Sequence, residues 1–261
     1  MPGRGQDWDV HVIAVPYHLD EYAPDLDLPL AAPRAVVVAS LPAGDVWGRL
    51  AALYGRVADE VAAAVEVGSC PLVVAGDCTT SLGVMAGLQR GGVDAAVVWF
   101  DAHGDVQTVE TTTSGYVGGM PLRLLVGYRP KLISEALGLR AVPEDRVMLV
   151  GARDLDPPEV EFLASSPIIR SDVADFEVDD APGGALYVHL DMDIFDPSYL
   201  SGLRFPAPYG PTSDDVVEAV RALLNTGRVA ALGVACTWYP GYEAGQRANA
   251  ALQQILADDL S

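Results

Sequence analysis

Short apolar runs recur along the chain, and longer stretches of mixed apolar and polar residues separate them. Several of these runs lack any alternation of polar and apolar residues, which is typical of strands buried on both faces of a parallel sheet. We therefore predict strands over residues 11–15, 35–39, 71–75, 96–100, 146–150, 168–169, 185–190 and 230–235.

The stretches between the runs predict helices, because their apolar residues recur at helical spacing. One of them opens on Thr212 and two nearby aspartates, which favour a capped helix start. Strands that alternate with helices predict a doubly wound α/β sandwich. The chain has 261 residues, half of them hydrophobic, which suits one domain over residues 1–261. The predicted helices are residues 47–67, 79–88, 157–163, 212–224 and 247–257.

Charge and composition restrict the classes of partner. The formal net charge is -20, from 36 acidic and 16 basic residues. Nucleic acids and anionic membranes bind basic surfaces, so we expect neither as a partner. No stretch approaches the ~20 apolar residues of a membrane helix, and residues 1–9 lack the apolar core of a signal peptide. We expect a cytoplasmic protein with reduced thiols, since three cysteines do not form a disulfide framework.

Acidic side chains and histidines gather after two of the predicted strands. Asp101, His103 and Asp105 follow the run at 96–100, and Asp191 and Asp193 follow another. Strand alternation predicts that each group shares one face. Ligands bind at the carboxyl ends of the strands in such sheets, so the groups are expected to converge. Carboxylates with an imidazole predict a site for one or two divalent cations.

Three further segments bear on this site. Gly76-Asp77-Cys78 follows the predicted strand at 71–75 and is expected at the same edge of the sheet. Residues 110–119 are rich in Thr and Gly and predict a loop over the site. Residues 17–33, rich in Asp, Leu and Pro, are consistent with a lid or with a surface arm.

Three ordered motifs resemble the ureohydrolase superfamily, the group of arginases and agmatinases. They are Asp101-Ala102-His103-Gly104-Asp105, the Thr-Thr-Thr-Ser-Gly run at 111–115, and Asp-Met-Asp-Ile-Phe-Asp-Pro at 191–197, within a match that extends over about residues 71–237. The resemblance implies a three-layer α/β/α sandwich with a mainly parallel sheet, assembled as homotrimers or hexamers. It also implies two Mn²⁺ ions with a bridging hydroxide, which attacks a guanidinium carbon and releases urea and an amine.

The resemblance also implies roles for individual residues. Asp105 and His103 become the catalytic residues, with Asp105 as the partner of the bridging water. Gln107 and Ser114 would meet the carboxylate of an amino-acid substrate, and Asp156 and Glu159 its α-amino group, which polar and acidic side chains suit. The implied metal ligands are Asp101, His103, Asp105, Asp191, Asp193 and Cys78.

Three positions depart from the family pattern. Cys78 replaces a histidine ligand, and a thiolate suits manganese less well than an imidazole. Gly118 stands where arginases often carry a proton-shuttling histidine. Residues 235–240 contain no carboxylate where the family has a glutamate for the guanidinium. The first two departures resemble the Nω-hydroxy-L-arginine amidinohydrolase branch of antibiotic biosynthesis, which implies the products ornithine and hydroxyurea.

Other interpretations stay open at this point. The chain is also consistent with a hydrolase acting on agmatine, guanidinobutyrate or another C–N substrate, or with a weakly catalytic structural or regulatory homologue. Cys78 is either a metal ligand or a buried core thiol. His189 either supports the ligands or is a core histidine. Asp156 and Glu159 also suit the first turn of a helix.

Overall fold

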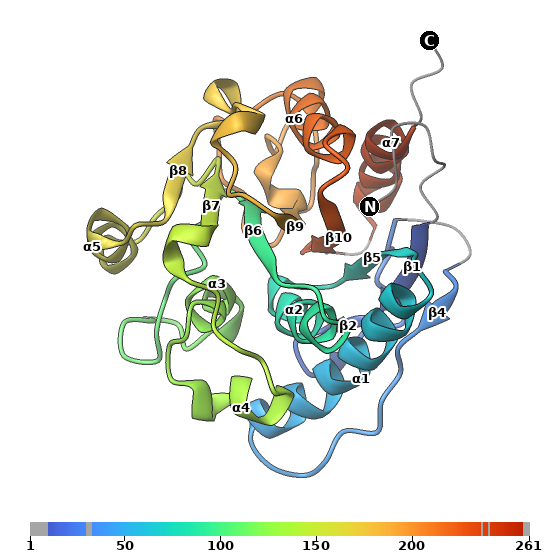
Figure 1. Ribbon diagram of the computed structural model, residues 1–261. Coiled ribbons are helices and arrows are strands. Elements are labelled where there is room, and N and C mark those ends of the chain that lie inside the picture. Colours follow the sequence, from blue (N-terminus) through green and yellow to red (C-terminus); the bar gives the residue numbers. More distant parts are fainter. Residues whose placement is uncertain (1–9, 30–32, 236, 240, 258–261) are drawn as a thin grey trace.

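A computed structural model describes residues 10–29, 33–235, 237–239 and 241–257. Its centre is an eight-stranded sheet, and every strand pairing described within it is parallel (Figure 1). A separate antiparallel hairpin, β2 (Tyr17–His18) with β3 (Glu21–Tyr22), follows β1. From edge to edge the sheet consists of β4 (Ala35–Val36), β1 (Val10–Val15), β5 (Cys70–Ala75), β10 (Val229–Ala235), β9 (Ala185–Asp191), β6 (Ala95–Phe100), β7 (Val147–Val150) and β8 (Ile169–Ser171).

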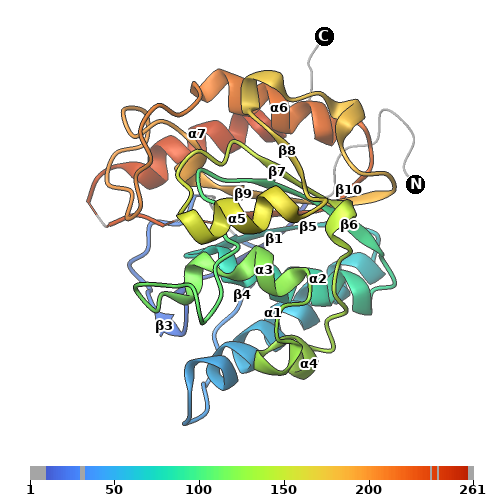
Figure 2. The same ribbon diagram turned by 90° about the vertical axis from the view of Figure 1, so that its left-hand side faces the viewer.

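Helices cover both faces of the sheet (Figure 2). One face carries α1 (Val46–Glu66), α2 (Ser81–Arg90), α3 (Pro121–Leu125) and α4 (Ser134–Leu137), and the other carries α6 (Ser213–Asn225) and α7 (Ala244–Leu256). The helix α5 (Pro157–Ser165) lies beside the β8 edge. Short 3-10 turns are η1 (Cys78–Thr80), η2 (Val117–Gly119), η3 (Pro130–Leu132), η4 (Glu144–Arg146), η5 (Val173–Asp175), η6 (Val178–Asp180) and η7 (Met192–Ile194).

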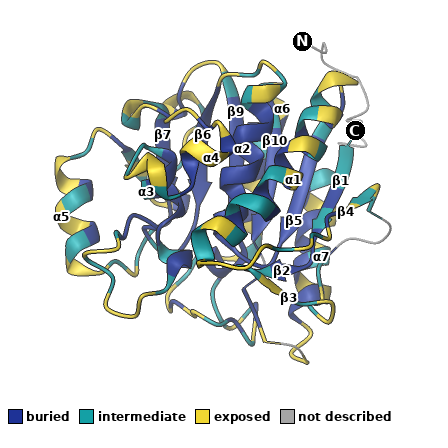
Figure 3. Ribbon diagram, turned by 90° about the horizontal axis from the view of Figure 1, so that it is seen from below, coloured by how far each residue is buried: buried dark blue, intermediate teal, exposed yellow. Residues whose placement is uncertain are grey.

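The sheet divides the core into two apolar clusters. Along β5, Val73 and Ala75 pack with the α1 and α2 side, whereas Leu72 and Val74 pack with the α6 and α7 side. Successive side chains of a strand point to opposite faces, so a central strand must be apolar throughout. Figure 3 shows the resulting buried band across the middle strands. The predicted three-layer α/β fold is therefore confirmed.

Element boundaries follow local chemistry. The side chain of Asp45 accepts a hydrogen bond from the Gly48 amide (2.9 Å) and caps α1. Thr212 and Asp215 form a reciprocal capping box at α6, as predicted from their sequence. The predicted strand at 35–39 is shorter, because β4 is an edge strand that pairs only with β1. Among the described residues, no helix has both the length and the apolar character needed to cross a membrane.

Candidate metal centre

The predicted metal ligands meet beyond the ends of three strands, β5, β9 and β6, with β10 lying between β5 and β9 in the sheet. Asp101 directly follows β6, and Asp191 is the last residue of β9. Asp193 lies within η7, and Cys78 opens η1 beyond β5. Because these strands are parallel, their carboxyl ends share one edge of the sheet, which is where the sequence predicted the site.

The backbone that presents Asp101, His103 and Asp105 differs from the prediction. Strand β6 ends at Phe100, and residues 101–107 adopt no regular element. Asp105 has a left-handed φ of 53°, which a β-strand does not contain. The prediction that strand alternation aligns these three side chains was therefore wrong, and an irregular turn of the chain brings them together.

Asp101 and His103 form one half of the site. The Asp101 carboxylate accepts hydrogen bonds from Trp99 Nε1 (3.0 Å) and from the His103 amide (2.7 Å). His103 Nδ1 lies 3.0 Å from Asp193 Oδ2 and 3.4 Å from Asp101 Oδ1. Burial by itself lowers the pKa of His103, but hydrogen bonds to these two carboxylates outweigh it and raise the pKa to about 12. The three side chains could hold one metal ion.

Cys78 and Asp191 form the other half. Cys78 Sγ donates to Asp191 Oδ2 (2.6 Å) and lies 3.9 Å from Asp101 Oδ2. The second Asp191 oxygen accepts from the Asp193 amide (2.9 Å) and from Thr237 Oγ1 (3.4 Å). Burial, followed by the charge of Asp191, raises the pKa of the Cys78 thiol. The thiol is thus protonated beside carboxylates and would ionise on binding a cation.

The donor set fits divalent metal ions. Four carboxylates, Asp101, Asp105, Asp191 and Asp193, are each at most 5% exposed. Asp105 Oδ2 has no hydrogen-bond partner, although it is buried. Burial and then neighbouring carboxylates raise the pKa of Asp105 above its ordinary range. Buried carboxylates at this density are costly unless a cation compensates their charge.

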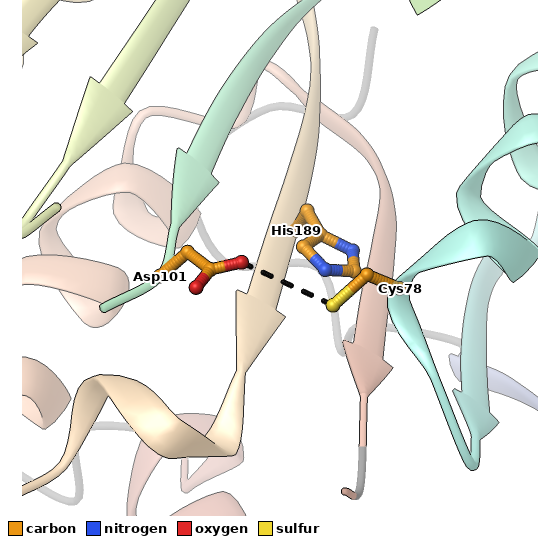
Figure 4. A group of neighbouring side chains, drawn as sticks. All are labelled: Cys78, Asp101 and His189. Carbon is orange, nitrogen blue, oxygen red and sulfur yellow. Dashed lines mark hydrogen bonds between the residues drawn. The ribbon is translucent and has the colours of Figure 1, made fainter. Parts of the chain in front are cut away.

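His189 lies beside this cluster on β9, from which it reaches toward Cys78 and Asp101 (Figure 4). Its ring stacks on Trp99 with centroids 3.7 Å apart, and its Nδ1 lies 3.1 Å from the hydroxyl of Tyr187. Its Nε2 is buried without a partner. Burial lowers the pKa of His189 to about 3, so the ring is neutral, and Nε2 has a free lone pair in the tautomer in which Nδ1 donates to Tyr187.

The predicted substrate-binding residues line the same cavity as His103, Asp105 and Cys78. Gln107 Nε2 donates to Asp156 Oδ2 (2.8 Å), and Thr111 Oγ1 donates to Gln107 Oε1 (2.7 Å). Asp156 is also the N-cap of α5. Gln107 and Asp156 are therefore held side by side, with Ser114 more exposed on the 110–119 loop.

Glu159 holds two segments of the chain together through its carboxylate. One of its carboxylate oxygens accepts from the Val106 amide (3.2 Å) and the other from the Asp156 amide (3.0 Å). The residue is buried, and Gly104 leaves room for it, since a Cβ there would lie 2.8 Å from Glu159 Oε1. Glu159 thus ties α5 to the loop after β6, and its predicted contact with substrate stays a prediction.

A cavity of about 190 Å³ joins the two sides of the site. It is lined by polar and acidic residues from the strand ends and by the loop at 110–119, as the sequence predicted for that loop. The lining residues are Cys78, His103, Asp105, Gln107, Thr112, Thr113, Ser114, Tyr116, Gly118, Gly119, Asp156, Glu159, Asp191, Asp193, Phe205 and Thr237.

Sequence reasoning missed one wall of this cavity. Tyr116 lines it, and the Tyr116 hydroxyl lies 3.3 Å from Nε2 of His18, which stands in the hairpin of residues 17–22. The Leu19 amide of this hairpin donates to Asp77. The described part of the 17–33 segment is thus an arm that braces the rim of the site. No local signal predicts these contacts, since their partners lie 58 and 98 residues away.

Sequence comparison identifies relatives over most of this region. A model of the arginase family matches residues 17–258. An arginase of Staphylococcus aureus (strain MRSA252) is 35% identical over 118 residues, which cover 45% of this chain and 39% of that protein. An arginase of Bacillus caldovelox is 30% identical over 173 residues, 60% of this chain and 57% of that protein. The matched part thus spans less than two thirds of either relative.

Structural comparison gives the same fold over a longer stretch. The crystal structure of arginase from Bacillus cereus matches with a TM-score of 0.82 at 21% identity, covering 97% of this chain and 99% of that one. The structure of formimidoylglutamase from Bacillus subtilis matches with a TM-score of 0.70 at 16% identity, covering 97% and 88%. At these identities the likeness establishes the arrangement of sheet and helices.

Proposed function

This chain belongs to the arginase family, and on that premise we propose that it is a metal-dependent amidinohydrolase. The preferred substrate in this proposal is Nω-hydroxy-L-arginine, which would yield ornithine and hydroxyurea. One observation supports the choice. Two residues that line the cavity depart from the family pattern: Cys78 stands where the resemblance implies a histidine metal ligand, and Gly118 where arginases often carry a proton-shuttling histidine.

The chemistry of the substrate agrees with these departures. A hydroxyguanidine is less basic than a guanidine, so it has less need of a carboxylate partner or of a proton shuttle. At the polar side, Gln107 and Ser114 would bind the substrate carboxylate, and Asp156 its α-ammonium group. Glu159 would hold Asp156 in place through the capping contact. These contacts would orient the reacting carbon toward Asp105 and His103.

Six side chains would hold the metal: Asp101, His103, Asp105, Asp191, Asp193 and Cys78. Bound Mn²⁺, as one ion or two, supplies a hydroxide nucleophile at neutral pH. The unpartnered Oδ2 of Asp105 would accept a hydrogen bond from that nucleophile. The His103 imidazole stays protonated in the metal-free protein through Asp101 and Asp193, and it must lose that proton to become a ligand.

The first test is product analysis. The metal-loaded protein is incubated with Nω-hydroxy-L-arginine and, separately, with arginine, and ornithine is measured by mass spectrometry. We expect ornithine mainly from the hydroxylated substrate. Faster turnover of plain arginine by fully manganese-loaded protein would overturn the modified-substrate proposal while leaving the amidinohydrolase proposal intact.

A second candidate function is hydrolysis of agmatine, guanidinobutyrate or another C–N substrate. Gln107 Nε2 and Asp156 Oδ2 are already hydrogen-bonded to each other at 2.8 Å. This pairing favours a substrate that makes no hydrogen bond to either side chain. S114A and D156N separate the two functions. Each is expected to lower kcat/KM on an α-amino acid substrate by about tenfold, the equivalent of one charge-assisted hydrogen bond, and to leave agmatine hydrolysis unchanged.

A non-catalytic structural or regulatory role is the remaining alternative. Protein that binds no metal, forms no product and associates stably with an active homologue would establish it. We further propose a cytoplasmic homotrimer or hexamer, following the family resemblance. Light scattering of the purified protein measures the mass of the assembly, and a monomer would contradict this part of the proposal.

A further inference from the structure

The buried neighbourhood of His189 offers a set of metal donors that the family resemblance does not include. Cys78 Sγ, a carboxylate oxygen of Asp101 and an imidazole nitrogen of His189 all lie within 4.8 Å of one another (Figure 4). The three residues are 5%, 1% and 2% exposed. His189 Nε2 has no hydrogen-bond partner, although it is buried. When Nδ1 donates to Tyr187, this buried Nε2 has a free lone pair next to a thiol and a carboxylate, which is the chemistry of a metal ligand.

The fold fixes the His189 ring in this position. Trp99 stacks on one side at 3.7 Å and also donates its Nε1 proton to Asp101. Tyr187 holds Nδ1 at 3.1 Å, in a space that exists because residue 233 is glycine: a Cβ there would lie 2.2 Å from the Tyr187 hydroxyl. Hydrogen bonding of one imidazole nitrogen commonly orients the other toward a metal.

We propose that Cys78, His189 and Asp101 form a mixed sulfur, nitrogen and oxygen position for one metal ion. His189, on β9, supplies an imidazole in place of the histidine that the family pattern has at position 78. Such a donor set prefers Zn²⁺ or Co²⁺ to Mn²⁺, whereas Asp101, His103 and Asp193 suit Mn²⁺. The two positions are thus unequal. This inference deepens the proposed function and rests on its metal dependence.

Cobalt spectroscopy tests the position without any assay of turnover. Metal-free full-length protein is titrated with Co²⁺, and sulfur-to-cobalt charge transfer is followed in the near ultraviolet. We expect a band that C78S abolishes. H189A is expected to weaken cobalt affinity at this position by at least about tenfold, and H189Q serves if H189A does not fold. Zn²⁺ is expected to displace the cobalt more effectively than Mn²⁺.

His11 provides a matched control, because its Nε2 is also buried and unpartnered but lies on β1. H11A is expected to keep the band and the affinity. A band of unchanged strength and affinity in H189A and H189Q would overturn the role of His189. Equal displacement by Mn²⁺ and Zn²⁺ would overturn the selectivity. A protein that hydrolyses no guanidino substrate would still show the cobalt band. Failure of the proposed metal position is therefore distinguishable from failure of the proposed function.

A second, independent observation concerns the wall of the cavity at Gly118. A Cβ at position 118 would lie 2.2 Å from Cε1 of the Tyr116 ring and 2.4 Å from its hydroxyl. The Tyr116 ring therefore occupies the space that a side chain at 118 would need. Tyr116 lines the cavity and packs on His18 and Phe205, with ring centroids 5.9 Å and 5.0 Å away.

Hydrogen bonding determines the direction in which the Tyr116 hydroxyl donates. His18 Nδ1 lies 2.9 Å from the Gly76 carbonyl oxygen, which can only accept, so Nδ1 carries a proton. In the neutral ring Nε2 then accepts from the Tyr116 hydroxyl at 3.3 Å. The lone pairs of the phenolic oxygen stay available to a donor on the substrate.

We infer that Tyr116, oriented by His18, determines specificity at the amidino end of the substrate. Its oxygen accepts a hydrogen bond from a substrate N–H or N–OH group, in the space where a side chain at 118 would otherwise stand. His18 is a positioning residue, since it acts through Tyr116. This inference also rests on the proposed function.

Equilibrium binding tests this role. Dissociation constants for Nω-hydroxy-L-arginine and arginine are measured by calorimetry on D105N, in which turnover is suppressed, and on D105N/Y116F. We expect loss of the hydroxyl to reduce the preference for the hydroxylated compound by about tenfold. G118A in the same background displaces the ring and is expected to act like Y116F. H18Q, which keeps an acceptor, is expected to restore the preference that H18A loses.

Y22F is the matched control, because Tyr22 is an exposed tyrosine of the same hairpin as His18. An unchanged preference in both D105N/Y116F and D105N/G118A would overturn the role of Tyr116. Tight, discriminating binding by D105N without turnover by the wild type would overturn the proposed function alone. Absence of binding of either compound to D105N that is shown to retain its metal would overturn both.

Discussion

Asp105 combines three properties that are costly to the stability of the metal-free protein but suit a metal ligand. Its backbone is left-handed, with φ at 53°, its Oδ2 is buried without a partner, and burial raises its pKa. Aspartate and asparagine tolerate this backbone better than other non-glycine residues. Such a residue is costly in the metal-free protein and becomes useful once a cation binds.

D105N tests whether Asp105 destabilises the metal-free protein. The amide keeps the shape and the backbone preference but removes an ionisable carboxyl group from the buried cluster. We expect the metal-free variant to unfold about 2–4 °C higher than the metal-free wild type. Turnover should fall by about 100-fold or more, since an implied ligand is lost. Calorimetric unfolding with and without metal measures the first effect, and a lower midpoint for metal-free D105N would contradict the explanation.

In the proposed metal site, the side chain at position 78 sets the metal preference. An imidazole suits manganese better than a thiolate does, so C78H is expected to raise Mn²⁺ affinity by about tenfold. Metal content after dialysis against Mn²⁺ measures the effect. C70A is the control, because the half-buried Cys70 thiol lies at the start of β5, away from the site. Unchanged manganese content in C78H would mean that the side chain at 78 does not reach the metal.

At the scale of elements, contacts between α5 and the loop after β6 join the two sides of the site. Glu159 makes this connection through the Val106 and Asp156 amides. On the other side, the 17–22 hairpin approaches the end of β5 so closely that a Cβ at Gly76 would lie 2.2 Å from the Tyr17 carbonyl. The geometry of the site thus depends on packing between elements that are distant in sequence.

E159A tests whether Glu159 braces these elements. The buried Val106 amide and the part-buried Asp156 amide would lose their acceptor, so we expect the free energy of unfolding to fall by about 2 kcal/mol. KM should rise at the same time, because Asp156 loses its support. Denaturant unfolding and steady-state kinetics measure the two effects, with E161A on the exposed face of α5 as control. A raised KM with unchanged stability would instead indicate direct contact with substrate.

At the scale of the whole molecule, acidic residues determine the net charge and the pH dependence of stability. The net charge of -20 accompanies four buried carboxylates at one end of the sheet. Burial, and then Asp101, raises the pKa of Asp193 to about 6, and burial places those of Asp105 and Asp191 above the ordinary range. The metal-free folded protein therefore holds protons that the unfolded chain releases above its ordinary pKa of 3.8.

The pH dependence of stability follows in sign. A raised pKa in the folded state contributes stability at low pH that is lost as the pH rises through the folded value. We expect the unfolding midpoint of EDTA-treated protein to fall as the pH rises from about 4 through about 6 and beyond. His189 opposes this between its folded pKa of about 3 and its ordinary value of 6.5, and so does Asp101, whose burial is outweighed by hydrogen bonds from His103 that lower its pKa. His103, whose pKa is raised to about 12, adds to the fall above 6.5.

Thermal unfolding across this range measures the effect, and bound metal is the control. A divalent cation neutralises the carboxylates, so the metal-loaded protein should show a much flatter profile in the neutral range. A midpoint of the metal-free protein that rises with pH above about 6 would contradict the assigned directions of the carboxylate pKa values.

The sequence by itself determined the elements and the edge of the sheet where the site lies. Strands such as β6 and β9 are buried on both faces, so their uninterrupted apolar runs identify them without knowledge of any partner. Parallel strands then place Asp101 and Asp191 at one edge. The resemblance to ureohydrolases contributed the ligand assignments, which the structure brings together around one cavity.

Only the tertiary structure decided how the remaining groups meet. The left-handed turn at Asp105, the free nitrogen of His189 beside Cys78, and the Tyr116 ring in the space next to Gly118 depend on contacts between separate elements. His18 reaches Tyr116 across 98 residues. Hydrophobic periodicity records which face of an element is buried, but it carries no information about which side chain of another element lies opposite.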